Sequence, residues 1–157
     1  MSAAAIDELQ LRYIRALDEK DMKGWLATFS RKAEATYVCT TAESAEGNLP
    51  VAMMLDDSRG RLEDRVTFIT KIWAGTFQDY RMRHFVQRIS SEQRGDVWHV
   101  RSNYQVVCTP IGRDQRIEQI SGIYEDVIDC SEGTPAFLSK KAIADEAVLP
   151  RYLVYPI

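Results

Sequence analysis

The chain has only two histidines, the side chains best suited to proton transfer near neutral pH. His84 and His99 lie fifteen positions apart, on two different predicted strands. A metal site needs several histidine, cysteine or carboxylate ligands that converge, and the spacings C-x-x-C and H-x-x-x-H are both missing from the sequence. The sequence therefore predicts no metal site in this chain.

General acid–base catalysis is the enzyme chemistry that these residues leave open. The eight glycines never form G-x-G-x-x-G or G-x-x-x-x-G-K-[ST], the motifs that cradle phosphate groups, and no G-x-S-x-G elbow is present. A histidine could instead act with a carboxylate such as Asp56, Asp57 or Asp126. An isomerase or dehydratase of this kind would need both groups to face an interior pocket.

The two histidines differ in their sequence surroundings. His99 lies on the polar face of its predicted strand, which favours solvent or a subunit contact over catalysis. His84 follows Arg81 and Arg83, and nearby cations disfavour the charged form of an imidazole. A neutral His84 could orient a carboxylate across a subunit interface, and a catalytic base is the alternative.

Charged residues crowd positions 56–65, at the start of a predicted helix. The segment is either a self-paired solvent face or an oligomer contact, because arginine pairs with carboxylates both within helices and across interfaces. Neighbouring residues on a helix point about 100° apart, so helix capping by Asp56 and Asp57 is favoured over a shared proton. The charged residues are Asp56, Asp57, Arg59, Arg61, Glu63, Asp64 and Arg65.

Helical periodicity precedes these charges. Residues 3–19 form a predicted amphipathic helix, Asp21 is a predicted N-cap for a short second helix through residues 22–29, and residues 33–41 are rich in strand-forming residues. The third predicted helix begins within the charged segment, with Asp56, Asp57 and Ser58 as cap candidates, and ends before Gly75. Its expected packing face consists of Leu62, Val66, Ile69 and Trp73.

Strand periodicity replaces helical periodicity after residue 81. Turn signals at 94–96, 112–114 and 132–135 divide the remainder into four long strands, which predicts an antiparallel meander. Residues 98, 100, 102, 104, 106 and 108 alternate with polar neighbours and form the predicted core face. This order predicts an α+β fold in which about three helices cover a strongly curved antiparallel sheet. It is the order of the cone-shaped NTF2-like/cystatin-like fold, and we expect residues 1–157 to form a single domain of this kind.

The final nine residues, 149–157, are apolar, aromatic and proline-containing, whereas a free tail is usually polar. We expect this segment to dock, either on its own sheet or between subunits. The three cysteines stand at wide spacings among apolar neighbours, which is typical of reduced core thiols.

Composition excludes several classes of partner. The formal net charge of -3 gives no electrostatic argument for binding nucleic acid or an anionic membrane. No apolar run approaches the roughly 20 residues of a membrane helix. The N-terminus has no cationic start and meets Asp7 early, so neither a secretory signal nor a transit peptide is expected and a cytoplasmic location is predicted.

Four segments carry a family resemblance. They are MLDDSRGRLEDRV (54–66), RHFV (83–86), SGIYEDV (121–127) and RYLVYPI (151–157). Together they resemble the small (β) subunit of Rieske-type aromatic-ring-hydroxylating dioxygenases, and residues 54–86 are most similar to small subunits of anthranilate 1,2-dioxygenase in the benzoate-type group. Related small subunits often carry a basic residue where this chain has Ile123, so no ion pair is carried over to that position.

The resemblance implies a non-catalytic structural subunit that forms a self-trimer and supports three large (α) oxygenase subunits in an α3β3 hexamer. It implies that the large subunit carries a Rieske 2Fe–2S cluster and a mononuclear Fe(II), with electrons supplied by NADH through a reductase. Such a cluster needs two cysteine and two histidine ligands, and this chain has no such set, so no catalytic, cofactor-binding or metal-binding residue is expected here. Anthranilate treated in this way would lose ammonia and carbon dioxide to give catechol, and benzoate, substituted benzoates and salicylate are the alternative substrates.

Seven residues are the expected subunit contacts: Arg61, Asp64, Arg65, Arg83, His84, Arg151 and Tyr152. The alternative function is a stand-alone NTF2-like isomerase or dehydratase with a His/Asp acid–base pair, in which His84 or His99 is the base. A simple ligand-binding module is a third class, and it would show a pocket without an acid–base pair.

Overall fold

The helices and strands follow the order expected from the sequence, with two additional short elements. The structure is a computed structural model that describes residues 3–112 and 116–157. Its helices are α1 (Ala3–Asp18), α2 (Met22–Ala27), α3 (Ala42–Glu46) and α4 (Arg59–Thr67), which continues into a π-helical turn at Phe68–Ile72. Its strands are β1 (Thr36–Thr41), β2 (Met54–Asp56), β3 (Tyr80–Arg94), β4 (Val97–Pro110), β5 (Glu118–Asp129) and β6 (Ala136–Ala144). The elements that the sequence did not predict are α3 and β2.

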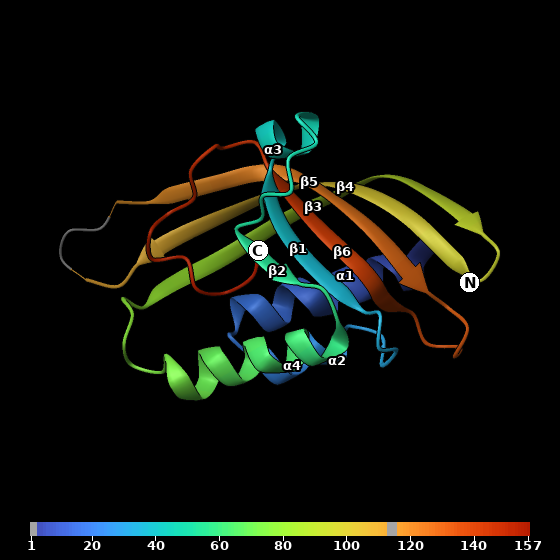
Figure 1. The fold of residues 1–157 in the computed structure, drawn as a ribbon, viewed down its shortest axis with the longest axis horizontal. Helices are drawn as coiled ribbons and strands as arrows, with labels where there is room; N and C mark the ends of the chain where they lie inside the picture. Colours follow the sequence, from blue (N-terminus) through green and yellow to red (C-terminus); the bar gives the residue numbers. More distant parts are fainter. Residues whose placement is uncertain (1–2, 113–115) are drawn as a thin grey trace.

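One curved sheet contains all six strands, in the order β2-β1-β6-β5-β4-β3 (Figure 1). Strands β3 to β6 form the predicted antiparallel meander, and β1 pairs in parallel with β6 and antiparallel with β2. Gly95 and Gly133 provide the positive φ angles, 62° and 80°, of two predicted turns. Of the third predicted turn, residues 113 and 114 lie outside the described part of the chain.

Helices α1, α2 and α4 lie together against one face of this sheet (Figure 1). The apolar stripe of α1 is buried, as the periodicity predicts, through Ile6, Leu9, Tyr13 and Leu17. Asp21 caps α2 by accepting a hydrogen bond of 2.9 Å from the backbone nitrogen of Gly24. This layer of helices on one face of a single sheet confirms the α+β prediction. Within the described residues, no helix is both long enough and apolar enough to cross a membrane.

The inner face of the sheet follows the predicted alternation along β4. Val100, Ser102, Tyr104, Val106 and Cys108 are buried, and the residues between them are exposed or half-buried. These inward side chains meet an aromatic core in which Tyr13 of α1 packs edge-on against Phe29, Tyr124 and Phe137. Edge-to-face packing of this kind adds to the stability gained by burying the rings.

The structure selects one of the three cap candidates of α4. Ser58 is the N-cap, because its hydroxyl accepts from the backbone nitrogen of Arg61, while Asp56 belongs to β2. The expected packing face is wrong at Trp73, which is 43% exposed, whereas Leu62 and Ile69 are buried. The intervening π-helical turn has hydrogen bonds over five residues, which rotates the following side chains away from the packed face.

Candidate functional site

The imidazole of His84 lies inside the protein, against the end of α1. Its side chain is 0% exposed, Nδ1 lies 2.6 Å from Oδ1 of Asp18, and the backbone nitrogen of His84 donates to Oδ2 of Asp18 at 3.2 Å. A carboxylate only accepts hydrogen bonds, so Nδ1 is the donor. The second ring nitrogen, Nε2, is buried without a hydrogen-bond partner.

This arrangement identifies an intrachain partner of His84 that differs from the acid–base partners expected from the sequence. The carboxylate is that of Asp18, and it is none of Asp56, Asp57 and Asp126. Asp18 could not be singled out in the sequence because it is one of several acidic residues on the polar side of α1. A carboxylate at the end of a helix that points back to a sheet leaves no periodic signal.

His99 lies on the outer face of the sheet, as the alternation along β4 predicts. It is half-buried and lines a surface hollow of about 400 Å³ together with Arg101, Glu125 and Lys141. His84 faces the core and His99 faces outward, so the two histidines do not share a site.

The aspartates proposed as acid–base partners are held by cations instead. Nε and Nη2 of Arg65 donate hydrogen bonds to the carboxylate of Asp56, and the distance from Nη2 to Oδ1 is 3.0 Å. Burial raises the pKa of Asp56, and the Arg65 guanidinium opposes that shift. Asp57 is exposed, with its carboxylate 4.0 Å from Nε of Arg61.

Asp126 forms a fully buried ion pair with Lys140. Nζ of Lys140 donates to both carboxylate oxygens, at 2.9 and 3.1 Å, and to Oε1 of Gln10 at 3.1 Å. The rings of Tyr13, Tyr124 and Phe137 surround the ammonium group, with Tyr124 centred 3.8 Å away. Burial lowers the pKa of Lys140 and raises that of Asp126, and the attraction between the two opposes both shifts.

The sequence did carry a signal for this pair that was missed. Lys140 shares the inward phase of β6 with Ala142 and Ala144, so the alternation places a lysine on the core face. A lysine at such a position requires a buried acidic partner.

The C-terminal residues occupy the interior between the helices and the sheet. Ile157 is completely buried, and its carbonyl oxygen accepts hydrogen bonds from the hydroxyls of Tyr13 and Tyr37 at 2.9 and 3.1 Å. Upstream, the Tyr80 hydroxyl accepts from the backbone nitrogens of Val154 and Tyr155, and Phe77 packs edge-on against the Tyr155 ring. The expectation that this segment docks is confirmed, and it docks within its own chain. These residues fill the part of the interior that lies around Tyr13, Tyr37 and Tyr80.

Potential metal ligands do not gather in the described residues, 3–112 and 116–157, where no group of three or more histidine, cysteine, aspartate or glutamate side chains could hold an ion. Cys39 and Cys108 are buried thiols, and burial raises the pKa of each to about 12. Both thiols therefore stay protonated at neutral pH, as residues of the core.

The seven expected contact residues fall into two groups. Four are exposed at the surface, namely Arg61, Asp64, Arg83 and Arg151. Three are held within the chain: Arg65 by Asp56, His84 by Asp18, and the half-buried Tyr152 by packing of its ring on Tyr80, at a centroid distance of 5.1 Å. The contact role of the seven residues stays a prediction.

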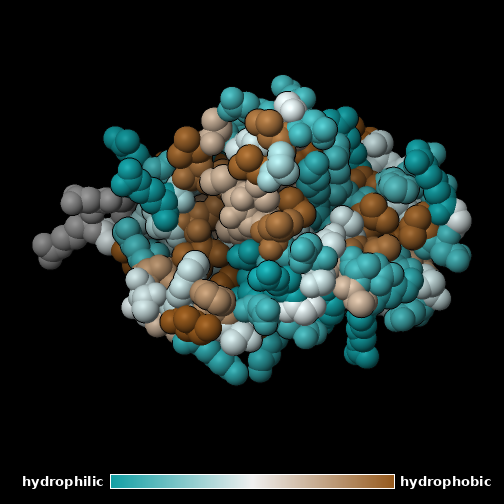
Figure 2. Space-filling view, in the orientation of Figure 1, coloured by the Kyte–Doolittle hydropathy of each residue, from teal (hydrophilic) through white to brown (hydrophobic). Residues whose placement is uncertain are grey.

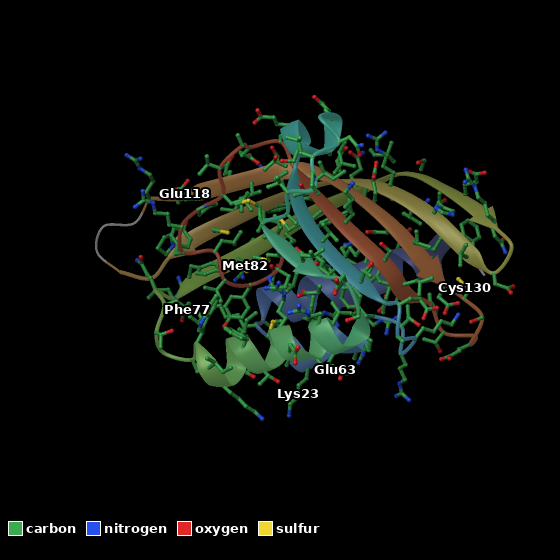
Figure 3. The ribbon with its side chains drawn as sticks, in the orientation of Figure 1. Lys23, Glu63, Phe77, Met82, Glu118 and Cys130 are labelled. Atoms are coloured by element: carbon green, nitrogen blue, oxygen red, sulfur yellow. The ribbon has the colours of Figure 1, made fainter. Side chains whose placement is uncertain are left out.

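Large apolar side chains are exposed next to Arg61 and Asp64. We call this region the β2–α4 surface, and its members are Leu49, Val51, Met53, Leu55, Phe68, Ile72 and Trp73, each between 43% and 56% exposed. The β2–α4 surface has two hollows, and Leu55 lines both of them. One is lined by Leu49 and Val51 as well, and the other by Phe68, Ile72 and Trp73. Figure 2 shows hydrophobic side chains gathered over the middle of this side of the molecule, in front of β1 and β2. Figure 3 shows Lys23 of α2 and Glu63 of α4 pointing outward, so both helices carry charged side chains on their outer side. An exposed apolar area of this extent is typical of a protein–protein contact.

A family model described as the ring hydroxylating beta subunit matches residues 12–151 of the chain. Comparison with curated proteins gives no match.

Solved structures show the same fold over nearly the whole chain. The β subunit assigned to an aromatic-ring-hydroxylating dioxygenase of Novosphingobium aromaticivorans has a TM-score of 0.79 and 26% identity, over 96% of this chain and 93% of that chain. The β subunit of the benzoate 1,2-dioxygenase of Burkholderia mallei has a TM-score of 0.72 and 26% identity, over 97% of both chains. A Nostoc punctiforme protein with a cystatin-like fold has a TM-score of 0.63 and 17% identity, over 94% of this chain and 96% of that chain, and this likeness concerns the fold alone.

Proposed function

This chain belongs to the ring hydroxylating β-subunit family, and on that premise we propose that it is the non-catalytic structural subunit of a multicomponent aromatic-ring-hydroxylating dioxygenase. Three copies support three large (α) subunits in an α3β3 hexamer in the cytoplasm. The large subunit carries the Rieske 2Fe–2S cluster and the mononuclear Fe(II), and NADH supplies electrons through a reductase. The role of this chain is to hold the large subunits in place.

The observation that carries this proposal is the β2–α4 surface. Six of its seven large apolar side chains, all but Met53, line two hollows that share Leu55, and an exposed tryptophan and phenylalanine are among them. Leaving them in water is unfavourable, and tryptophan in particular is enriched among the residues that dominate binding energy at interfaces. Arg61 and Asp64 line the same hollow as Phe68 and Trp73, which gives the contact a polar rim. We assign this surface to contacts within the hexamer.

The interior supports a structural role over a stand-alone dehydratase or isomerase. The C-terminal residues fill the interior around Tyr13, Tyr37 and Tyr80, and the imidazole of His84, which is held by Asp18, is fully buried. An acid–base pair acts on a substrate only if the substrate can reach it. The pair is better explained as a link between α1 and β3.

For the substrate of the complex we propose an aromatic acid, with anthranilate first, converted to catechol with loss of ammonia and carbon dioxide. The similarity to a benzoate 1,2-dioxygenase β subunit, at 26% identity, supports an aromatic acid. Benzoate, substituted benzoates and salicylate are the alternatives. Turnover of each compound by the complete complex with its reductase and NADH, followed by product identification, decides among them.

Co-expression with the large subunit tests the structural role. We expect the two chains to purify together as one iron-containing complex, and we expect the double variant Phe68→Ser/Trp73→Ser to lower the yield of that complex at least about tenfold, since each exposed aromatic anchor contributes 1 kcal/mol or more. Val148→Ser, which removes a 78% exposed apolar side chain outside the surface, is the control and should assemble normally.

The thermal unfolding midpoint of each purified variant chain separates assembly from folding. An iron-free chain that never associates with the large subunit would overturn the structural role. Normal assembly of the double variant would move the contact away from the β2–α4 surface.

A further inference from the structure

A second, separate cavity lies between α1 and the inner face of the sheet. It has a volume of about 160 Å³ and is lined by residues of α1, β3, β4 and β5. We propose that this cavity, which we call the α1 cavity, is a binding site for a small neutral aromatic molecule that carries a hydrogen-bond acceptor. The proposal concerns this chain alone and holds whether or not the chain assembles with a large subunit.

The walls and size of the α1 cavity suit a single ring. Its apolar lining includes Ile6, Ile14, Val86, Val100 and Ile128. A cavity of about 150 Å³ with aliphatic walls binds benzene in other proteins. Flat apolar ligands gain most of their affinity from leaving water for such walls. The α1 cavity therefore has room for one six-membered ring with a small substituent.

Gln10 gives the cavity a hydrogen-bond donor. Oε1 of Gln10 faces Nζ of Lys140 at 3.1 Å, and because an ammonium group only donates, the amide orientation is fixed with the oxygen toward the lysine. The amide nitrogen, Nε2, is then left buried without a hydrogen-bond partner among residues 3–112 and 116–157, although Gln10 lines the cavity. A buried donor without an acceptor is unfavourable, so a ligand oxygen that accepts from Nε2 gains a bond the protein itself does not supply.

The charges around the cavity select a neutral ligand. Two carboxylates line it, and each already has its own cation: Asp126 is paired with Lys140, and Asp7 is paired with Arg88 at 2.7 and 3.0 Å. Arg88 is the one cationic residue among the described lining residues, and it is already paired with Asp7. A carboxylate ligand would therefore enter without a counter-charge, beside two existing carboxylates, and burying such a charge is costly.

The Asp7–Arg88 pair marks the entrance. The two side chains join α1 to β3 and are partly exposed, whereas Ser102 and Asp126 on the opposite side of the cavity are buried. Arg88 stands at the irregularity of β3, where the register with β4 shifts between Arg88 and Ser90. Such bulges redirect side chains at the edge of functional sites. Separation of this surface ion pair costs little, so a ring can pass it.

Nuclear magnetic resonance of the methyl groups tests the proposal with phenol as the probe, on the full chain. We expect saturable one-site binding with a Kd of about 1 mM or tighter, and shifts concentrated on the methyl groups of Ile6, Ile14, Val86, Val100 and Ile128. Benzoate should bind at least about tenfold more weakly than phenol, because it is charged. The proposal is overturned if phenol shows no saturable binding, which is the result for a cavity that holds only water. It is also overturned if the chemical shift changes are centred on other methyl groups.

Two variants identify the interactions. Gln10→Glu keeps an oxygen for Lys140 but replaces the amide donor by an acceptor. Anisole, whose ether oxygen only accepts hydrogen bonds, should therefore bind this variant about tenfold more weakly than the native chain, while benzene, which has no acceptor oxygen, changes less than about threefold. Val86→Phe fills the cavity and should abolish binding of both rings. Unchanged anisole affinity in Gln10→Glu overturns the assigned hydrogen bond, and unchanged affinity in a folded Val86→Phe overturns the assigned cavity.

Discussion

Asp18 holds His84 with both of its carboxylate oxygens, one on the backbone nitrogen and one on the imidazole, and so joins the end of α1 to β3. Replacing Asp18 by Asn leaves the shape of the side chain but turns one of the two acceptors into a donor. We expect this substitution to lower the free energy of unfolding by about 1.5–3 kcal/mol, the range for hydrogen bonds to charged groups. Urea denaturation measures the change.

The control for that substitution is Asp21→Asn, because Asn caps a helix as well as Asp and the cap of α2 should survive. Equal losses of stability in the two variants would show that the Asp18–His84 contact has no special role.

The Asp126–Lys140 pair should behave as a unit. Lys140→Met leaves a buried carboxylate without its cation, and we expect a loss of about 3–5 kcal/mol. Asp126→Leu combined with Lys140→Met removes both charges, and the double variant should be more stable than either single variant. A double-mutant cycle from denaturant unfolding gives the coupling energy, and strictly additive losses would contradict the pairing.

Stability at acidic pH should depend on Asp129. Burial acts to raise the pKa of Asp129, but hydrogen bonds from Lys32 and Ser131 outweigh it and hold the pKa at about 2, below its ordinary value of 3.8. Because the folded pKa is the lower one, the ionised group stabilises the fold above about pH 4, and this contribution is lost as the pH falls toward 2. Unfolding of Asp129→Asn should therefore change less with pH between 4 and 2 than unfolding of the native chain. Parallel pH profiles would refute this assignment.

Two tyrosines offer a matched test of the C-terminal segment. The Tyr80 hydroxyl accepts hydrogen bonds of 2.9 and 3.0 Å from Val154 and Tyr155, whereas the hydroxyl of Tyr152 is buried without a partner. We expect Tyr80→Phe to cost about 1–3 kcal/mol, because two buried backbone donors lose their acceptor, and Tyr152→Phe to be neutral or stabilising. Thermal unfolding and protease cleavage near the C-terminus measure both effects. A larger loss in Tyr152→Phe than in Tyr80→Phe would be the opposite of this expectation.

Gly122 should tolerate no side chain. A Cβ atom at this position would lie 2.0 Å from the carbonyl oxygen of Ile143, on the neighbouring strand β6, and backbone atoms cannot yield as a flexible side chain does. Gly122→Ala should therefore destabilise the chain severely, by several kcal/mol. The matched control is Gly60→Ala in α4, where the nearest atom is 4.0 Å away and helix propensity favours Ala by up to about 1 kcal/mol. Similar soluble yields and unfolding midpoints for the two variants would contradict this account.

Sequence periodicity made most of the sheet and the helix layer predictable. Buried residues alternate with exposed ones along β4, and the buried residues of α1 recur at helical spacing. Periodicity could not predict β2, whose three residues are too few to show a pattern, nor the exposure of Trp73, which depends on a π-helical turn. Within the candidate site, sequence identified His84 but not Asp18, because their contact joins positions 66 apart in the chain. The buried Lys140 was predictable from its phase in β6, although its three aromatic neighbours were not.

The parallel pairing of β1 with β6 has a consequence for folding. Thr36 lies opposite Ser139. After β1 has been synthesised, about 100 further residues must therefore be made before its main partner strand, β6, exists. Contacts so distant along the chain close slowly, because the entropy of the intervening loop is lost before the pairing is gained. During synthesis, β1, with its apolar residues Tyr37 and Cys39, is therefore left with an open edge. We expect newly made chains to be most prone to aggregation before β6 arrives, and early synthesis of the partner subunit does not remove that interval.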